Sequence, residues 1–324
     1  MPGLDIGPAG EVRRRRGWDL DFTRGRLLID GRASADLDAW LAAVGATFER
    51  AGPAYGETAD GGLVAFAADR PRATDAGLWL EAAGENRLRD SAFEGSGAWA
   101  LFNCISAAAP GAAPDGGTAA RRLTVTADGP ALAAQSVIAH APGAGLIFSL
   151  YVRAGTSTTP ANAFGLYNST TAQNLLFVRI DLTTGALTYA VGTTGAAVSP
   201  GPAGWWRLTL TVTGGVAEGD GLSVYPGLPG GVCTAGTDVD VWGPQLARAG
   251  AAGSPILTGA SPGARAADRL DLPLPDRARR IRATWGADQV TELVRADLPD
   301  PEVLDLAGDW PWRGHALRRL EVTP

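Results

Sequence analysis

The segment GLWLEAAGENRLRDSAFEGSGAW, from Gly77 to Trp99, marks the point where the sequence pattern changes. Before it the chain is polar and rich in turn residues. After it, short segments of alternating polar and apolar residues follow one another to about residue 246. Within it, residues 78–80 (LWL) predict a strand, and Gly95-Ser96 predicts a break before Trp99. Apolar residues at alternate positions, separated by turn residues, are typical of strands, so the segment predicts the entry into an all-β domain.

The alternation is strongest in three later segments, which predict strands with one apolar and one polar face. They are LIFSLYVR at 146–153, LLFVRIDL at 175–182 and WWRLTLTV at 205–212. Leu176, Val178 and Ile180 share one face of the second segment, opposite Arg179. Trp206 shares the apolar face of the third, which leaves Trp205 on the polar face. Many short strands without helical patterns between them predict an antiparallel sandwich whose inner faces alone are packed.

The flanking regions predict smaller elements and set the domain boundaries. Residues 34–44 have apolar side chains at helical spacing, with Ser34 as the expected N-cap and Gly45 as the expected stop. We expect an N-terminal arm and attachment region at 1–76, the sandwich at 77–250, a linker at 251–272 and a small C-terminal β module at 273–324. That module is too small to be stable without packing on a neighbour. The basic run at 13–16 is either solvated or ordered on an acidic surface.

Composition and charge exclude several classes of function. The chain has 324 residues, 45% of them hydrophobic, and its net charge of −6 with a pI near 5.0 argues against nucleic-acid binding. No apolar run reaches the ~20 residues of a membrane-spanning helix, and we expect no secretory signal. The two cysteines, Cys104 and Cys233, are either small buried hydrophobes or a bridge between neighbouring strands.

Catalytic and metal-binding patterns are missing from the sequence. The two histidines, His140 and His315, have no zinc-ligand spacing around them, and no nucleophile or phosphate-binding motif is present. We therefore predict no catalytic residue, no cofactor and no metal. Glu94 and Asp240 could meet and bind calcium, or remain ordinary surface carboxylates. A pair of carboxylates would suffice for a glycosidase, and the sequence alone does not identify one.

The polar strand faces predict saccharide contacts. Sugars stack their apolar ring faces on aromatic side chains and pair their hydroxyls with amide and guanidinium groups. Residues 156–174 (TSTTPANAFGLYNSTTAQN) are rich in hydroxyl and amide groups. The alternative is a solvated loop with ordinary strand exteriors. The candidate contacts are Arg153, Asn162, Tyr167, Asn168, Asn174, Arg179, Tyr189 and Tyr225.

A series of motifs in a fixed order resembles a known family. The series includes GLWLEAAGENRL at 77, APDGGTAARRLT at 113, LYVRAG at 150, GWWRLTLTV at 204, VWGPQLARAG at 241 and RAADRLDL at 265. It resembles the phage head-spike and tail-fibre family over about residues 20 to 272, and NRLRDSAFEGSGAW is similar to the opening of family 4/9-type carbohydrate-binding modules. The resemblance implies a jelly-roll sandwich. The chain has Val241-Trp242-Gly243 where calcium-binding modules carry aspartates, which argues against a calcium site.

The resemblance also implies a function. The chain would be a non-enzymatic structural adhesin, a head spike or tail fibre of a phage-like particle that comes from a prophage or is a gene transfer agent. It would bind host capsular or other surface polysaccharide. Its other partners would be spike, capsid or tail proteins and further copies of itself, with neither nucleic acid nor membrane insertion involved. Such a protein is assembled in the bacterial cytoplasm, released on lysis and displayed on the particle surface. The alternatives are a ligand-free decoration or adaptor protein and a capsule depolymerase.

Overall fold

The computed structural model describes residues 17–94, 97–139, 145–156, 163–192, 195–248, 253–286, 289–297, 303–305 and 316–324. They form two compact units, each with its own hydrophobic core. Unit 1 comprises the described residues within Met1–Ala59, Phe66–Ala82 and Ala266–Pro324. Unit 2 comprises those within Asp60–Ala65 and Ala83–Arg265. The strand β6 (Leu63–Phe66) includes residues of both units, because residues 63–65 belong to unit 2 and Phe66 belongs to unit 1.

Unit 2 is built from antiparallel strands. They are β9 (Gly84–Asn86), β10 (Ala100–Phe102), β11 (Cys104–Ala108), β12 (Arg121–Val125), β13 (Gly129–Ile138), β14 (Leu146–Ala154), β15 (Ala163–Asn168), β16 (Gln173–Ile180), β17 (Leu187–Gly192), β18 (Ala196–Pro200), β19 (Trp206–Val212), β20 (Gly221–Gly227), β21 (Pro229–Cys233), β22 (Asp238–Arg248) and β23 (Gly263–Arg265), together with the 3-10 turn η1 (Pro202–Gly204).

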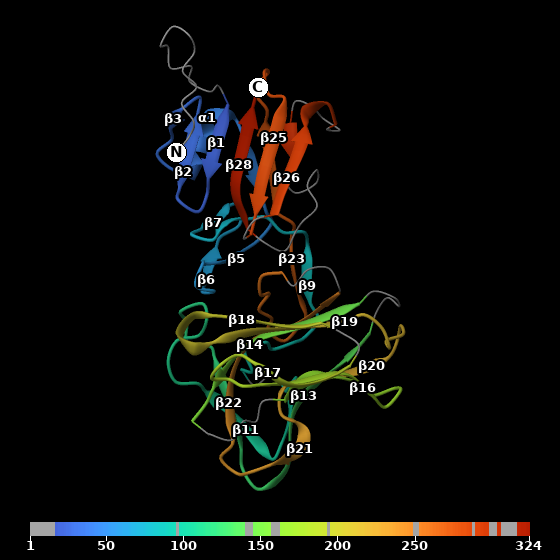
Figure 1. The fold of residues 1–324 in the computed structure, drawn as a ribbon. Coiled ribbons are helices and arrows are strands. Elements are labelled where there is room, and N and C mark those ends of the chain that lie inside the picture. Colours follow the sequence, from blue (N-terminus) through green and yellow to red (C-terminus); the bar gives the residue numbers. More distant parts are fainter. Residues whose placement is uncertain are drawn as a thin grey trace. The chain divides into compact units, whose positions relative to one another are not determined.

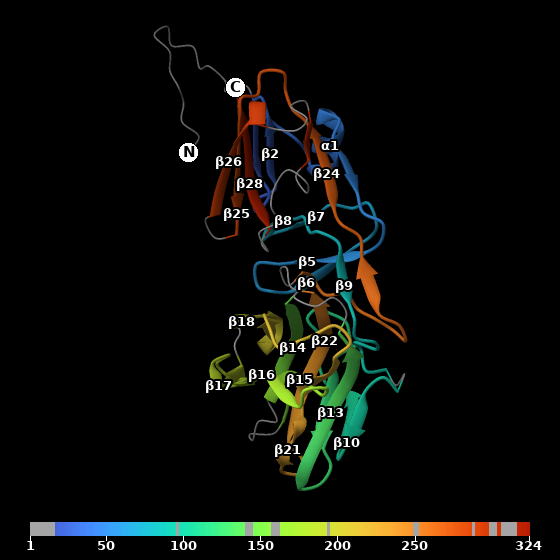
Figure 2. The same cartoon turned by 90° about the vertical axis from the view of Figure 1, so that its right-hand side faces the viewer.

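Two sheets form the sandwich of unit 2 (Figures 1 and 2). The first has the order β10-β13-β20-β15-β16-β17, with β21 also paired to β13; the second has the order β11-β12-β22-β14-β19-β18. The core between them contains the apolar residues predicted from the alternation, including Phe148, Val178 and Leu210, all without exposed surface. Burial of these side chains is the main favourable term in folding the unit. The predicted fold class, a mostly β protein with an antiparallel jelly-roll sandwich, is confirmed.

Unit 1 is also mostly β. Its elements are β1 (Trp18–Asp21), β2 (Arg26–Ile29), β3 (Arg32–Ala33), α1 (Leu37–Val44), β4 (Thr47–Glu49), β5 (Ala54–Glu57), β7 (Arg72–Thr74), β8 (Gly77–Trp79), β24 (Arg269–Pro273), β25 (Arg280–Trp285), β26 (Gln289–Val294), η2 (Arg295–Asp297), β27 (Val303–Asp305) and β28 (Leu317–Thr323).

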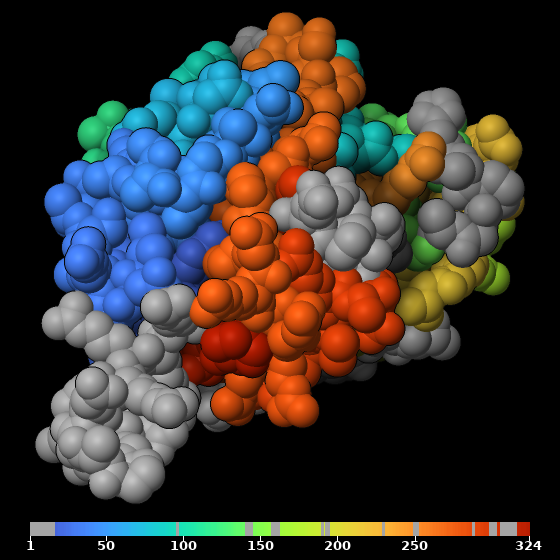
Figure 3. Space-filling model, turned by 90° about the horizontal axis from the view of Figure 1, so that it is seen from above, coloured from blue at the N-terminus to red at the C-terminus, as the bar shows by residue number. Residues whose placement is uncertain are grey.

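The two ends of the chain share one sheet in unit 1. Its strand order is β26-β25-β28-β1-β2-β3, and β1 pairs with β28 from Trp18 opposite Val322 to Asp21 opposite Arg319. Figure 3 shows the blue N-terminal and the orange-to-red C-terminal segments side by side. The core beneath includes Leu20, Trp40 and Leu320. The C-terminal strands therefore obtain from the N-terminal strands the packing that they need.

This arrangement differs from the division expected from the sequence. The expected N-terminal region and C-terminal module form one unit, because β1 and β28 pair across nearly the whole length of the chain. Residues 77–82, expected to open the sandwich, belong to unit 1, where Leu78 pairs with Leu317. A strand pattern shows that a segment pairs, and it does not show with which distant strand.

The predicted helix is present but starts later than expected. α1 begins after Asp36, whose carboxylate accepts a hydrogen bond from the Ala39 amide at 2.8 Å, so Asp36 is the N-cap in place of Ser34. Gly45 ends the helix as predicted, with φ of 71° in the left-handed region. Within the described residues, no helix is long and apolar enough to cross a bilayer.

A buried ionic cluster holds distant segments of unit 1 together. Asp268 accepts a hydrogen bond from Arg50 at 3.0 Å and a further one from Arg72, and Arg72 also pairs with Glu81. The side chains are at most 1% exposed. The Glu81 amide donates to Asp268 at 2.7 Å. Since each charge has an opposite partner, the cluster avoids the cost of an unpaired buried charge.

Candidate functional site

The outer face of the first sheet of unit 2 carries a cluster of ring and polar side chains. β15 lies between β20 and β16, and its residues Phe164 and Leu166 point into the core with no exposed surface. Because strand side chains alternate between the two faces, Gly165 and Tyr167 lie on the outer face.

Cross-strand pairing brings three aromatic residues to this face. Gly165 lies opposite Tyr225 of β20 on one side and opposite Phe177 of β16 on the other. The ring centroids of Phe177 and Tyr225 are 5.6 Å apart, with the ring planes inclined at 39°. Tyr167 lies two residues further along β15, and all three side chains are half-buried. We call Tyr167, Phe177 and Tyr225 the aromatic face.

Gly165 permits the close packing of Phe177 over the strand. A Cβ atom on residue 165 would lie 2.8 Å from Cγ of Phe177 and 2.3 Å from the carbonyl oxygen of Leu176. Both distances are too short for real contacts, so no other residue fits without a shift of the strand. Glycine is thus required here for a close approach, and the ring occupies the space that a side chain would take.

Hydroxyl and amide groups lie beside the rings. Tyr167 is opposite Ser223 of β20 and opposite Asn174 of β16, and Ser223 is in turn opposite Ser136 of β13. The side chains of Asn174 and Ser136 are exposed. This row therefore supplies both hydrogen-bond donors and acceptors next to apolar ring surface.

The Tyr225 phenol stays protonated at neutral pH. Burial raises its pKa, and the neighbouring Tyr167 raises it further, whereas a hydrogen bond with Ser223 lowers it. Burial is the largest of these effects, so the pKa lies above its ordinary value. The neutral phenol can donate a hydrogen bond while its ring offers an apolar surface.

Several residues predicted as saccharide contacts meet on this face. Tyr167, Asn174, Arg179 and Tyr225 all lie on its three adjacent strands, and Tyr189 of β17 is opposite Arg179 in the backbone register. Asn162 lies outside the described residues. Their role in binding remains a prediction.

Asn168 was predicted to contact sugar, but it is buried and makes its hydrogen bonds within the protein. Its side chain has no exposed surface, and its amide donates to the Asp220 carboxylate at 2.7 Å and to the Gly215 carbonyl at 3.0 Å. Its own oxygen accepts from the Thr170 and Thr171 amides. All of its hydrogen-bonding groups are used within the turns at this end of the sheet, so it is not available to a ligand.

Arg153 also differs from the expectation, because it lies on the other sheet and is tied to the protein. Its guanidinium donates to Asp240 at 2.9 Å and to the Pro110 carbonyl at 2.6 Å. It also lies 4.5 Å above the Trp205 ring. These contacts fix the connection between β11 and β12 over the sheet.

The outer face of that second sheet is covered, contrary to the prediction of a solvated polar face. Trp205, Tyr151 and Trp242 are each only 1% exposed. The Trp205 indole donates to the Ala112 carbonyl at 3.0 Å, and Arg207 donates to the Gly253 carbonyl at 2.5 Å. Loops from distant parts of unit 2 therefore close over this face. The expectation that only the inner faces are packed is wrong for this sheet.

Phe177 belongs to the aromatic face and Ser223 lies beside it, and neither was among the predicted contacts. The alternation that places Leu176 and Val178 in the core also places Phe177 on the side of Arg179. That signal was present in the sequence. The sequence did not show that Phe177 and Tyr225 are neighbours, because their proximity depends on the pairing of β20 with β15.

Asp240 is buried and pairs with the arginine side chains Arg122 and Arg153. Arg122 donates to it at 2.6 Å, and this hydrogen bond raises the pKa of the Arg122 guanidinium. Glu94 is exposed, and among the described residues no group of three or more His, Cys, Asp or Glu side chains is placed to hold a metal ion. The calcium site considered for Glu94 with Asp240 has no support in this geometry. His140 and His315 lie outside the described residues.

Both cysteines are free thiols. Cys104 is buried and its Sγ donates to the Leu132 carbonyl at 3.0 Å, whereas Cys233 is half-buried. Burial raises the pKa of both thiols. They therefore serve as small packing residues and not as reactive thiolates at neutral pH.

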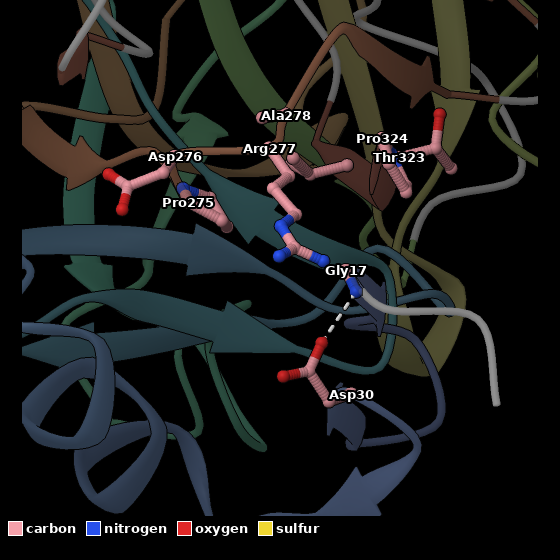
Figure 4. A pocket seen from close by; sticks show the side chains of 9 residues that line it. Gly17, Asp30, Pro275, Asp276, Arg277, Ala278, Thr323 and Pro324 are labelled. Atoms are coloured by element: carbon pink, nitrogen blue, oxygen red, sulfur yellow. Dashed lines mark hydrogen bonds between the residues drawn. The ribbon is translucent and has the colours of Figure 1, made fainter.

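A pocket of about 220 Å³ in unit 1 has a different character (Figure 4). The Gly17 amide donates to Asp30 at 2.7 Å within it, and Arg277 and Thr323 also line it. None of the described residues that line this pocket is aromatic. It lacks the ring surface on which a sugar stacks.

Comparison with known proteins assigns the chain to no family. No protein-family model and no curated protein sequence matches it. Among solved structures it is similar to the CBM22-1 xylan-binding domain of Paenibacillus barcinonensis Xyn10C, with 16% sequence identity and a TM-score of 0.34, over 53% of this chain and 99% of that one. It is also similar to the CBM22-1–GH10 modules of Clostridium thermocellum Xyn10B complexed with xylohexaose, with 15% identity and a TM-score of 0.28, over 53% of this chain and 29% of that one.

Proposed function

We propose that unit 2 binds a polysaccharide on the aromatic face. The observation that carries this proposal is the row of Tyr167, Tyr225 and Phe177 on one outer sheet face, beside the hydroxyl and amide groups of Ser223 and Asn174. Sugars need an apolar surface and hydrogen-bond partners together. The second sheet does not offer this combination, because loops cover its outer face.

The expected affinity for sugar follows from the number of aromatic rings on which a sugar can stack. Stacking on one aromatic ring contributes about 1 kcal/mol, which is about fivefold in affinity. Binding by two or three such rings is weak for a single site. Useful adhesion would then require several copies of the chain acting together on one polymer or cell.

We further propose that the chain is a non-catalytic adhesin of a phage-like particle. The resemblance of the ordered sequence motifs to those of head-spike and tail-fibre proteins supports this role. Unit 1 would attach the chain to spike, capsid or tail proteins, several copies would assemble on the particle surface, and the aromatic face would bind host capsular polysaccharide. Such a particle would form in the bacterial cytoplasm and leave the cell on lysis.

Binding of the purified chain to capsulated and acapsular cells of the same strain tests the proposal. We expect binding to capsulated cells only, and a loss of about tenfold or more when Phe177 and Tyr225 are both replaced by alanine. Phe102→Ala is the matched control: Phe102 is 61% exposed on the edge strand β10 of the same sheet, outside the aromatic face. It should leave binding unchanged.

The binding experiment, together with an activity assay on purified capsule, distinguishes the alternatives. Equal binding to both cell types, or wild-type binding by the double variant, would overturn the proposed site. An absence of any saccharide binding would favour a ligand-free decoration protein. Release of reducing ends from purified capsule would favour a depolymerase.

A further inference from the structure

Arg179 holds an unusual position in the sheet that carries the aromatic face. Seven strands make up this sheet, and Arg179 is the only charged residue in any of them. The whole chain, by contrast, carries a net charge of −6. A cation among otherwise uncharged strands makes the local electrostatic potential more positive and so favours an anionic group of a ligand.

The place of Arg179 relative to the rings is set by the strand register. It follows Phe177 by two residues on β16, so both lie on the same face about 7 Å apart. The positions next to it across the sheet are Ala163 of β15 and then Gly227 of β20. The side chain of Ala163 is only a methyl group and Gly227 has none, so these two residues place no bulky group between Arg179 and the Tyr225 ring.

The nearest carboxylate in the sequence, Asp181, makes hydrogen bonds within its own turn. Asp181 is the residue directly after β16, and its carboxylate accepts hydrogen bonds from the Thr183 and Thr184 amides at 2.8 and 3.3 Å. The hydrogen bond with Thr183 is the main reason why its pKa is lowered. The carboxylate is thus turned into its own loop. Arg179 is exposed at the border of the aromatic face.

We propose that the polysaccharide bound on the aromatic face is acidic, and that the Arg179 guanidinium pairs with a carboxylate of its sugars. The inference rests on the proposed function and adds the substrate class. A planar guanidinium matches a carboxylate in a two-pronged arrangement, which a neutral sugar does not provide. The rings hold the sugar, and Arg179 selects for the charged one.

Binding to matched acidic and neutral polymers tests this inference. The probes are polygalacturonate, alginate and hyaluronan, each beside its carboxyl-reduced neutral form, with the full-length chain in affinity electrophoresis or calorimetry. We expect at least one acidic polymer to bind about three- to tenfold more tightly than its reduced form at low salt, and this preference to fall as salt rises. Arg179→Gln should abolish the preference, and Arg179→Lys should restore part of it.

Arg248→Gln is the control, since Arg248 is 53% exposed on the other sheet of the same unit and the charge change is identical. It should keep the preference. Reduced polymers that bind as well as acidic ones, or an Arg179→Gln variant that keeps the wild-type preference, would overturn the inference while leaving the proposed function intact. If neither acidic nor neutral polymers bind, both fail together.

Discussion

Replacement of Asn168 by alanine should destabilise unit 2 and leave its ligand affinity unchanged. The residue lies next to Tyr167 in sequence, and its type fits a sugar contact. Its side chain is nevertheless fully buried and makes four hydrogen bonds inside the protein. The substitution therefore separates a role in folding from a role in binding.

The size of the expected loss in the free energy of unfolding depends on which of the lost hydrogen bonds water can replace. The Thr170 and Thr171 amides and the Gly215 carbonyl belong to exposed residues, so water takes over much of those three bonds. Asp220 is 7% exposed, and it would keep only the Ala217 amide, at 2.8 Å, of the two donors described for it. A hydrogen bond to a buried charged group contributes about 1.5–3 kcal/mol, and the space left by the amide adds to the loss. We expect a total of about 2–4 kcal/mol.

Thermal denaturation of the full chain measures this effect. For a unit of this size, 2–4 kcal/mol corresponds to a decrease in Tm of about 4–16 °C in the transition that reports unit 2. Asn174→Ala is the matched control, an exposed amide in the same hairpin, and should change stability by less than about 0.5 kcal/mol. A variant at Asn168 that melts within 1 °C of the wild type, or that loses saccharide affinity while stable, would refute the structural role.

Two further perturbations test the cores of the units. Asp268→Asn leaves Arg50 and Arg72 with one carboxylate fewer in a buried site, so it should destabilise unit 1 by about 3–5 kcal/mol in urea unfolding; a change below 1 kcal/mol would contradict the described ion cluster. Because burial raises the pKa of Cys104 and Cys233, the folded chain keeps thiol protons that the unfolded chain loses above about pH 8.5. The free energy of unfolding should therefore fall as the pH rises from 8.5 to 10, and replacing both cysteines by alanine should reduce that slope; an unchanged slope would exclude the thiols as its cause.

Local patterns predicted the strands and their inner faces well. Alternation placed Leu176, Val178 and Ile180 on one side of β16, and all three are at most 1% exposed. Gly45 was predicted to end α1 because a left-handed residue is needed there, and it does. These features depend on a few neighbouring residues, so the sequence contains what is needed to predict them.

Features that depend on distant pairing were not predictable in the same way. The Gly77–Trp79 strand looked like the first strand of the sandwich, yet it pairs with β7 and β28 in unit 1. The change of sequence pattern that this strand marks falls a few residues before Ala83, where the longer range of unit 2 begins. No local pattern distinguishes a strand that pairs with Leu317 from one that pairs with a nearer segment.

The contrast between Arg153 and Arg179 shows why outward position alone does not define a site. Both follow an apolar core residue on an amphipathic strand, and both were predicted to contact sugar. Arg153 meets Asp240, which lies 87 residues away in the sequence, and holds the Pro110 carbonyl beside it. Arg179 lies in a sheet without another charge in any of its strands. The coverage of one sheet by distant loops thus restricts the candidate site to the other sheet, where ring surface and the single cation lie within two residues of each other on β16.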